Sequence, residues 1–215
     1  MRYLITLFAM LTVSGKVDGQ EFGSVRGVVL DAGKNPVSGA IVYGLPERDM
    51  RHKIQTTSDS TGVFLMTNVP PGAIYLDAYN ESLGYPYNAF SFFGVSKGPV
   101  KISVSAGRVF PDVVIQLGPK GARLNLEIMN IDGAPVTAGA GLVFTRDDVP
   151  RQGRYERGAR AKESILVPAV PFRLAVKAAG YQEWHYGGES WQGNEGLIVL
   201  TSGGVLNLLV RLKPE

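Results

Sequence analysis

The chain of 215 residues contains no cysteine, two histidines and two tryptophans. Without cysteine it has neither a disulfide framework nor a thiol for a lipid anchor, so its stability must come from burial of an apolar core. Neither His52 nor His185 begins a short His and Glu ligand pair of the kind that holds zinc. These scarcities argue against a lipoprotein and against a zinc enzyme, and they predict no metal and no cofactor.

Long apolar runs are also absent, apart from a short one at the start of the chain. Residues 3–13 are apolar and follow Arg2, which is the layout of a secretory signal, and the run is too short to span a bilayer. We expect cleavage before Gln20, so that residues 1–19 are a signal peptide and the mature protein is exported, either periplasmic or secreted, with no membrane span. The formal net charge of the whole chain is only +3, which gives no indication of nucleic-acid binding.

Helical periodicity is missing from the rest of the chain. Short apolar runs rich in Val, Ile, Leu and Tyr are separated by Gly, Pro, Asn and Asp, a pattern typical of an all-β sandwich. The strands expected in the first half are residues 24–30, 40–44, 54–57, 63–67, 73–79, 101–104 and 113–117.

An internal repeat sets the expected number of domains. Residues 23–43, "GSVRGVVLDAGKNPVSGAIVY", are echoed by residues 121–144, "GARLNLEIMNIDGAPVTAGAGLVF". Two further pairs follow in the same order, with the sequence of 68–79 echoed in 166–181 and that of 100–117 in 197–212. We therefore predict two tandem small Greek-key β-sandwiches, prealbumin-like or Ig-like, with residues 22–118 in the first and 119–215 in the second.

Each repeat contains a turn of similar composition, "DAGKNPV" from Asp31 and "DGAPV" from Asp132. In such turns Asp accepts backbone N–H bonds, Gly supplies a positive φ and Pro pre-sets its own φ. We expect Asp31 and Asp132 to act as the acceptors.

The first repeat resembles the carboxypeptidase regulatory-like domain. The matching positions are Gly27, Asp31, Gly33, Pro36, Val37, Gly39, Ala40, Gly62, Phe64, Val69, Pro70, Pro71, Gly72 and Tyr75, within residues 23–85. One residue is inserted at Ala73 and Ile74, and the second half lacks the "TGVF" hairpin, with "AKESILVPAV" in its place. The resemblance implies a transthyretin-like, carbohydrate-binding-like sandwich of exported bacterial proteins, non-catalytic and with no catalytic residues to transfer.

Catalytic and metal-binding patterns are weak throughout. Ser190 lies in "GGESWQG", where Gln192 occupies the position at which a nucleophile elbow needs glycine. Asp59 and the pair Asp147 and Asp148 offer oxygen ligands for calcium without the spacing of a loop cage, which favours turn capping.

Two other polar features each allow a functional and a structural interpretation. Asn207 on a closing strand has no evident lysine partner for an isopeptide bond, so we interpret it as a surface residue. The stretch 151–162, "RQGRYERGARAK", spaces four arginines three apart around Tyr155. It is interpreted either as a solvated loop or as a site for phosphate or an acidic glycan.

Clustered aromatic residues are the strongest functional signal. Each half places an aromatic-rich loop before its last two strands, residues 84–94 and 177–193. Exposed rings stack on sugars or anchor protein contacts, whereas buried rings only close the end of a sandwich. The speculative ligand-binding residues in the second loop are Tyr181, Trp184, Tyr186 and Trp191, with Gln182, Glu183 and Asn194 as a polar rim.

These patterns lead to three functional hypotheses. The first is an exported non-catalytic protein that binds or scaffolds a protein or an extracellular polysaccharide. The second is a carbohydrate-binding accessory module that acts through residues 181–194. The third is a hydrolase, which predicts a pocket joining His185 to Ser190 or Glu189.

Overall fold

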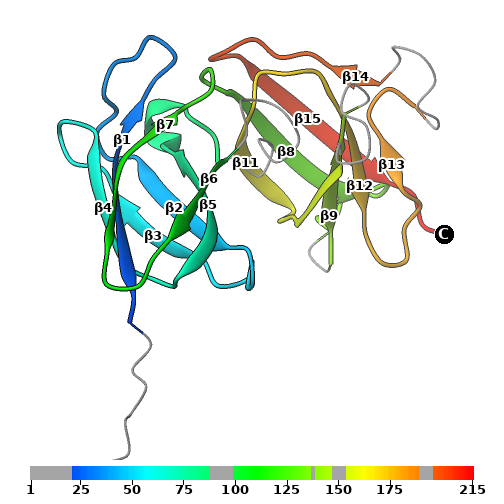
Figure 1. Cartoon of the computed structure of the whole chain (residues 1–215). Helices are drawn as coiled ribbons and strands as arrows, with labels where there is room; N and C mark the ends of the chain where they lie inside the picture. The colour runs from blue at the N-terminus through cyan, green and yellow to red at the C-terminus, as the bar shows by residue number, and fades with distance from the viewer. Residues whose placement is uncertain (1–20, 88–98, 137–138, 147–153, 189–195) are drawn as a thin grey trace, which may run out of the picture.

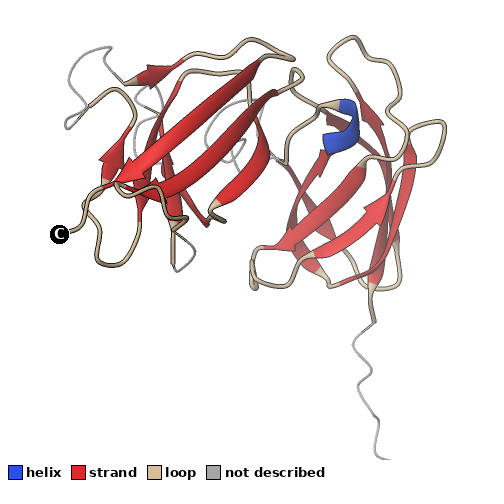
Figure 2. Ribbon diagram, turned by 180° about the vertical axis from the view of Figure 1, so that it is seen from behind, coloured by secondary structure: helices blue, strands red, loops and turns tan. Residues whose placement is uncertain are grey.

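The computed structural model describes residues 21–87, 99–136, 139–146, 154–188 and 196–215. In these ranges the chain is all-β, with strands β1 to β15 and one 3-10 helix, η1 (Glu81–Leu83). None of the helices in this part of the chain is long and apolar enough to cross a bilayer. Figure 1 shows two β-sandwiches side by side, the first coloured blue to green and the second green to red, and Figure 2 shows the same arrangement from behind.

The first sandwich consists of two sheets that enclose one apolar core. The three-stranded sheet has the order β4 (Val63–Val69), β1 (Gly23–Leu30) and β7 (Val109–Gln116). The four-stranded sheet has the order β3 (Ile54–Thr57), β2 (Ile41–Pro46), β5 (Gly72–Tyr79) and β6 (Val100–Val104).

The second sandwich repeats this plan around a core of its own. Its three-stranded sheet has the order β11 (Lys162–Val167), β8 (Ala122–Asn130) and β15 (Val205–Leu212). The facing sheet has the order β10 (Arg154–Gly158), β9 (Gly141–Thr145), β12 (Phe172–Lys177) and β13 (Trp184–His185), and β14 (Leu197–Ile198) also pairs with β12.

The pairing of strands reproduces the internal repeat. The first and last strands run parallel in both sandwiches, β1 with β7 and β8 with β15. An isolated bridge joins Leu30 to Pro36 in the first turn and Met129 to Pro135 in the second. The three echoes in the sequence therefore fall on corresponding strands, and the predicted all-β fold of two tandem sandwiches is confirmed. The predicted signal peptide lies outside the described residues.

Alternation of buried and exposed residues explains why these segments form strands. Along β1, Gly23, Val25, Gly27 and Val29 are buried, while the residues between them lie on the outer face. At Gly27 a Cβ would lie 2.2 Å from the Val113 carbonyl oxygen and 2.7 Å from Cζ of Phe64. A glycine is needed here because the Val113 backbone and the Phe64 ring fill the space that a side chain would occupy.

The predicted strands of the first half match the structure closely, and the largest differences are at β7. That strand begins at Val109 rather than at residue 113, and β3 has the predicted bounds. The larger correction concerns the stretch "RQGRYERGARAK", which was expected to be a loop. Within it, Arg154–Gly158 is a strand that pairs with β9. Likewise, β11 fills the place of β4 although the "TGVF" signature is absent.

The two repeat turns differ from expectation in detail. Asp31 acts as predicted, because its Oδ1 accepts the Asn35 backbone N–H at 2.8 Å. In the second turn this role belongs to Asn130, whose Oδ1 accepts the Ala134 N–H at 2.8 Å, and not to Asp132. Asn130 is the residue that aligns with Asp31, so a short polar acceptor at the end of the strand decides the turn.

The left-handed residue of each turn also needs a correction. It is Gly133 in the second turn, with φ +86°, but Lys34 in the first, with φ +66°. The same position of the turn has a left-handed conformation in both repeats, but only the second repeat has a glycine there.

Candidate functional site

The segment between the sandwiches is held against the first of them. The Gly121 N–H donates to the carbonyl oxygen of Gly84 at 2.8 Å, just after η1. Lys120 Nζ lies 5.7 Å from the centre of the buried Tyr85 ring, within the range of a cation–π contact. These contacts bring the end of β5 and the start of the second sandwich together.

A tyrosine cluster covers part of the outer face of the sheet that contains β2 and β5. The rings of Tyr79 and Tyr87 meet edge to face at 4.9 Å, and Tyr87 lies 5.2 Å from Tyr43. Tyr43 is 1% exposed, and its hydroxyl donates to Asp77 Oδ2 at 3.2 Å. Burial, together with the Asp77 carboxylate, raises the pKa of Tyr43 well above its ordinary value. The Tyr43 hydroxyl therefore stays protonated, and Lys53 Nζ lies 5.3 Å from the centre of the Tyr87 ring.

A groove of about 840 Å³ lies where this cluster faces the second sandwich, and we call it the junction groove. Its volume is in the range of ligand sites, about 300–1,000 Å³. From the first sandwich it is lined by Tyr79, Glu81 and Tyr87. The second sandwich contributes Tyr155 and four cationic side chains, Arg123, Arg157, Arg160 and Lys162. Burial, and next to it Tyr155 of the second sandwich, raise the pKa of Tyr87 above its ordinary value.

The arginine run of residues 151–162 is divided by the strand that it forms. Side chains alternate along β10, so a spacing of three sends neighbouring arginines to opposite faces. Arg154 lies on the exposed side and pairs with Glu156 at 2.5 Å, whereas Arg157 pairs with Glu163 at 3.0 Å and lines the junction groove. Arg151 lies outside the described residues. The run therefore supplies Arg157, Arg160 and Lys162 to the groove but not Arg154.

The aromatic loop of the second sandwich is partly integrated into the fold. Trp184 and His185 form β13, which pairs with β12. Tyr181, Trp184 and Tyr186 are half-buried and pack against the core, with 6.5 Å between the centres of the Trp184 and Tyr186 rings. Trp191 and Asn194 lie outside the described residues.

A second, smaller groove of about 540 Å³ lies beside this loop. It is lined by Gln182, Trp184, His185, Arg211 and Lys213, among others. Gln182 Nε2 donates to the Pro214 carbonyl at 3.1 Å, which ties the loop to the end of the chain. Trp184 thus both lines this groove and packs against the second core.

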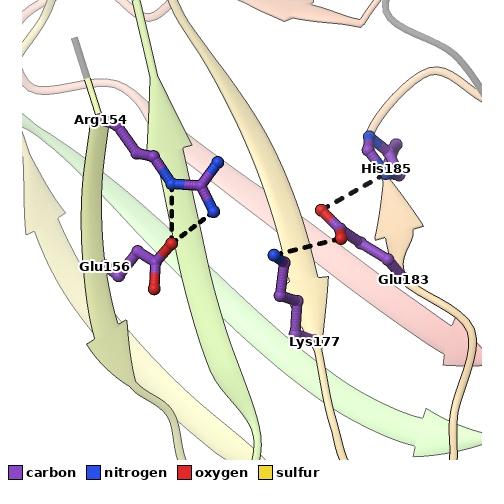
Figure 3. A network of polar contacts seen from close by, with 5 residues as sticks. All are labelled: Arg154, Glu156, Lys177, Glu183 and His185. Atoms are coloured by element: carbon purple, nitrogen blue, oxygen red, sulfur yellow. Dashed lines mark hydrogen bonds and ion pairs between the residues drawn. The ribbon is translucent and has the colours of Figure 1, made fainter.

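Glu183, in the aromatic loop, forms two ion pairs on the outer face of its sheet. Figure 3 shows Glu183 between Lys177 Nζ, at 3.3 Å, and His185 Nε2, at 3.5 Å. His185 Nε2 therefore contacts the Glu183 carboxylate. Ser190 and Glu189, the other members of the hypothetical hydrolase pocket, lie outside the described residues.

Two of the remaining polar candidates, Asp59 and Asn207, form hydrogen bonds within the fold. Oδ1 of Asp59 accepts three bonds, from the Thr61 N–H at 2.8 Å, the Thr61 hydroxyl at 2.7 Å and the Val63 N–H at 3.0 Å. The exposed Asn207 accepts a bond from Asn125 Nδ2 at 2.7 Å on the outer face of its sheet, as a surface strand residue does. Asp147 and Asp148 lie outside the described residues. No group of three or more metal-ligating side chains occurs among the residues that the structure describes.

Sequence reasoning missed most of the junction groove. Arg123 lies on β8 and Tyr79 ends β5, positions far apart in the chain that no motif connects. Two signals were available, the first aromatic loop of residues 84–94, which contains Tyr87, and the arginine run of residues 151–162.

Comparisons with known proteins show fold likeness alone. No protein-family model matches the chain, and no curated protein matches it. Similar solved structures include the TIE protein of Bacillus anthracis, with 14% identity, a TM-score of 0.36 and coverage of 90% of this chain and 34% of that one. A streptococcal ancillary pilin has 12% identity, a TM-score of 0.36 and coverage of 92% and 63%. The minor pilin of Streptococcus agalactiae has 13% identity, a TM-score of 0.33 and coverage of 90% and 96%. The chain thus spans about a third of the first of these proteins and just under two thirds of the second.

Proposed function

We propose that this chain is an exported, non-catalytic β-sandwich protein that binds or scaffolds a protein or polysaccharide partner outside the cytoplasm. The observation that carries the proposal is the junction groove, to which the first sandwich contributes tyrosine rings and the second contributes four cations and Tyr155. Loops and edges presented by a rigid sandwich are common binding surfaces. Export is supported by the apolar run after Arg2.

Membership of the carboxypeptidase regulatory-like family is part of this proposal. Its support comes from the structural roles of the shared residues. Phe64 fills the core beside Gly27, and Gly62 adopts a left-handed φ of +75° in the hairpin that precedes Phe64. We also propose that residues 22–118 and 119–215 are separate folding units, because the buried residues form two clusters.

Binding to whole source cells tests the proposal and does not require an identified partner. We expect labelled mature protein to bind saturably, and Arg160→Glu with Lys162→Glu to weaken binding by roughly tenfold, since exposed cations at a site are turned into repulsive charges. The matched control is Arg26→Glu with Arg48→Glu, two exposed arginines that do not line the groove. Protease treatment of the cells removes a protein partner and spares a polysaccharide. Unsaturable binding, or equal loss in the control, would contradict the proposal.

A second candidate function is carbohydrate binding through residues 181–194, with Tyr181, Trp184, Tyr186 and Trp191 as the platform. The observation in its favour is that Trp184 lines the smaller groove together with Arg211. Aromatic faces flanked by donors suit sugar rings.

Tryptophan fluorescence separates this candidate from the first. In a Trp191→Phe variant, Trp184 is the only remaining tryptophan, because the chain has two. If the loop binds a glycan, that glycan should protect Trp184 from acrylamide quenching. Quenching that stays unchanged at glycan concentrations that saturate binding would make the loop purely structural.

A further inference from the structure

The two walls of the junction groove differ in chemistry. One wall carries the rings of Tyr79 and Tyr87, and Tyr155 lies close to them from the second sandwich. The other wall carries Arg123 on β8 and the cations that flank the start of β11. A ligand that fits both walls needs a flat face for the rings and negative charge for the cations.

The cations of the groove are available to a ligand. Arg160 and Lys162 are exposed, and neither side chain forms a hydrogen bond or ion pair within the described ranges. Among the residues that the structure describes, Arg123 donates one long bond, from Nη1 to the Ser164 hydroxyl at 3.3 Å, and a guanidinium has four further N–H donors. Together with Arg157, these side chains provide four positive charges along one groove.

Two carboxylates lie among these cations and restrict the class of ligand. Glu81 and Glu163 line the same groove, so four positive and two negative charges leave a local net charge of +2. The Glu163 side chain is 10% exposed, and Arg157 holds its Oε2 at 3.0 Å. Within the described part of the chain, its Oε1 has no hydrogen-bond partner. A buried acceptor without a partner favours a ligand that carries hydrogen-bond donors. Such a donor would meet Oε1 either after rotation about the last side-chain torsion of Glu163, which is broad, or through a bridging water.

A chain of phosphates does not meet these requirements, because phosphate oxygens only accept hydrogen bonds and are repelled by Glu81 and Glu163. A sugar acid does meet them. Its carboxylate pairs with arginine, its hydroxyls donate to the two glutamates, and the apolar face of its ring lies on tyrosine.

We propose that the junction groove binds an acidic polysaccharide through its uronic-acid units. Arg123, Arg160 and Lys162 hold the carboxylates, Glu81 and Glu163 accept hydroxyl bonds, and the tyrosines support the sugar ring. This inference rests on the proposed function and names the class of partner for the same site.

Affinity electrophoresis in gels containing polygalacturonate tests this proposal. We expect the mature protein to be retarded by polygalacturonate and not by neutral dextran. Arg160→Gln with Lys162→Gln should weaken the affinity for polygalacturonate by about tenfold, because two charge-assisted contacts are lost. Arg26→Gln with Arg48→Gln, which removes the same charge elsewhere, should change it by less than about twofold.

A Glu81→Ala variant distinguishes recognition of a sugar acid from attraction of any polyanion. If Glu81 accepts a hydroxyl, its removal weakens binding of polygalacturonate. If the groove attracts negative charge alone, the same change strengthens binding, and it does so equally for a single-stranded oligonucleotide. Tighter binding of polygalacturonate by this variant would therefore overturn the proposal.

The failure of this inference is separable from the failure of the proposed function. Wild-type protein that is not retarded by polygalacturonate, but still binds source cells through Arg160 and Lys162, overturns the acidic-polysaccharide inference alone. Loss of both properties overturns the function as well. Retardation that is equally reduced in the Arg26 and Arg48 control also overturns the inference, since net charge and not the groove would then be responsible.

Discussion

Phe144→Ala is expected to lower the free energy of unfolding of the second sandwich by about 3–5 kcal/mol. The side chain is 1% exposed, and its ring lies 5.6 Å from Phe172 and 6.1 Å from Tyr155. Truncation removes the apolar contacts of a whole ring and leaves a cavity between the two sheets. Because Phe144 also borders the junction groove, the change should weaken binding there as well as stability.

Calorimetry of Phe144→Ala, with Phe64→Ala as its counterpart, also tests the proposed division of the chain. Phe64 is likewise 1% exposed but belongs to the core of the first sandwich. If residues 22–118 and 119–215 unfold separately, each variant lowers the temperature of one thermal transition and leaves the temperature of the other unchanged. A single transition that moves equally in both variants would show one cooperative unit and contradict the proposed domains.

Gly62→Ala is expected to cost the first sandwich roughly 3 kcal/mol, the sum of a backbone and a packing penalty. Gly62 has φ +75°, a left-handed conformation that costs other residues about 1–2 kcal/mol. The added Cβ would lie 2.8 Å from the Val29 carbonyl oxygen and 3.0 Å from Cβ of Pro36, so overpacking adds about 1–3 kcal/mol. Backbone atoms cannot move aside without breaking the bond from the Val29 N–H to the Gly62 carbonyl oxygen, which is 2.9 Å long.

The matched control is Gly39→Ala in the same sandwich. Gly39 has φ +66°, but the nearest atom to its added Cβ is Asn80 Nδ2 at 3.7 Å, an ordinary contact. Only the left-handed conformation is then penalised, and urea denaturation should show a loss of about 1–2 kcal/mol. Equal losses for the two variants would mean that the close approach to Val29 contributes nothing.

The local pattern was sufficient to predict most of the strands. Period-two alternation between turn residues identified β3 with its observed bounds and placed β1 within one residue of its start. This alternation did not predict β10. Charged residues lie on the exposed face of that strand and Arg157 lies on its other face, so polar and apolar residues do not alternate along it. Strand pairing with β9 overrides this weak local preference, as expected for a short edge strand.

The predicted ligand residues illustrate a different limit. The sequence shows that aromatic residues gather in two loops, but it does not show which rings pack on a core. Tyr181, Trp184 and Tyr186 pack partly against the second core, and their assignment to a ligand site stays a prediction. Tyr79 and Tyr87, in contrast, line the junction groove; Tyr87 belongs to the first aromatic loop, but no sequence motif singles out Tyr79.

The amino-acid sequence by itself therefore determined the all-β class, the tandem repeat and the positions of the main turns. These depend on alternation, on turn chemistry and on contacts between residues close in the chain. Only the tertiary structure decided that Tyr79, Arg123 and Arg160 share one groove. The reason is that Tyr79 and Arg123 come from strands of different sheets and Arg160 from the segment between β10 and β11, and no periodic pattern in the chain records such proximity.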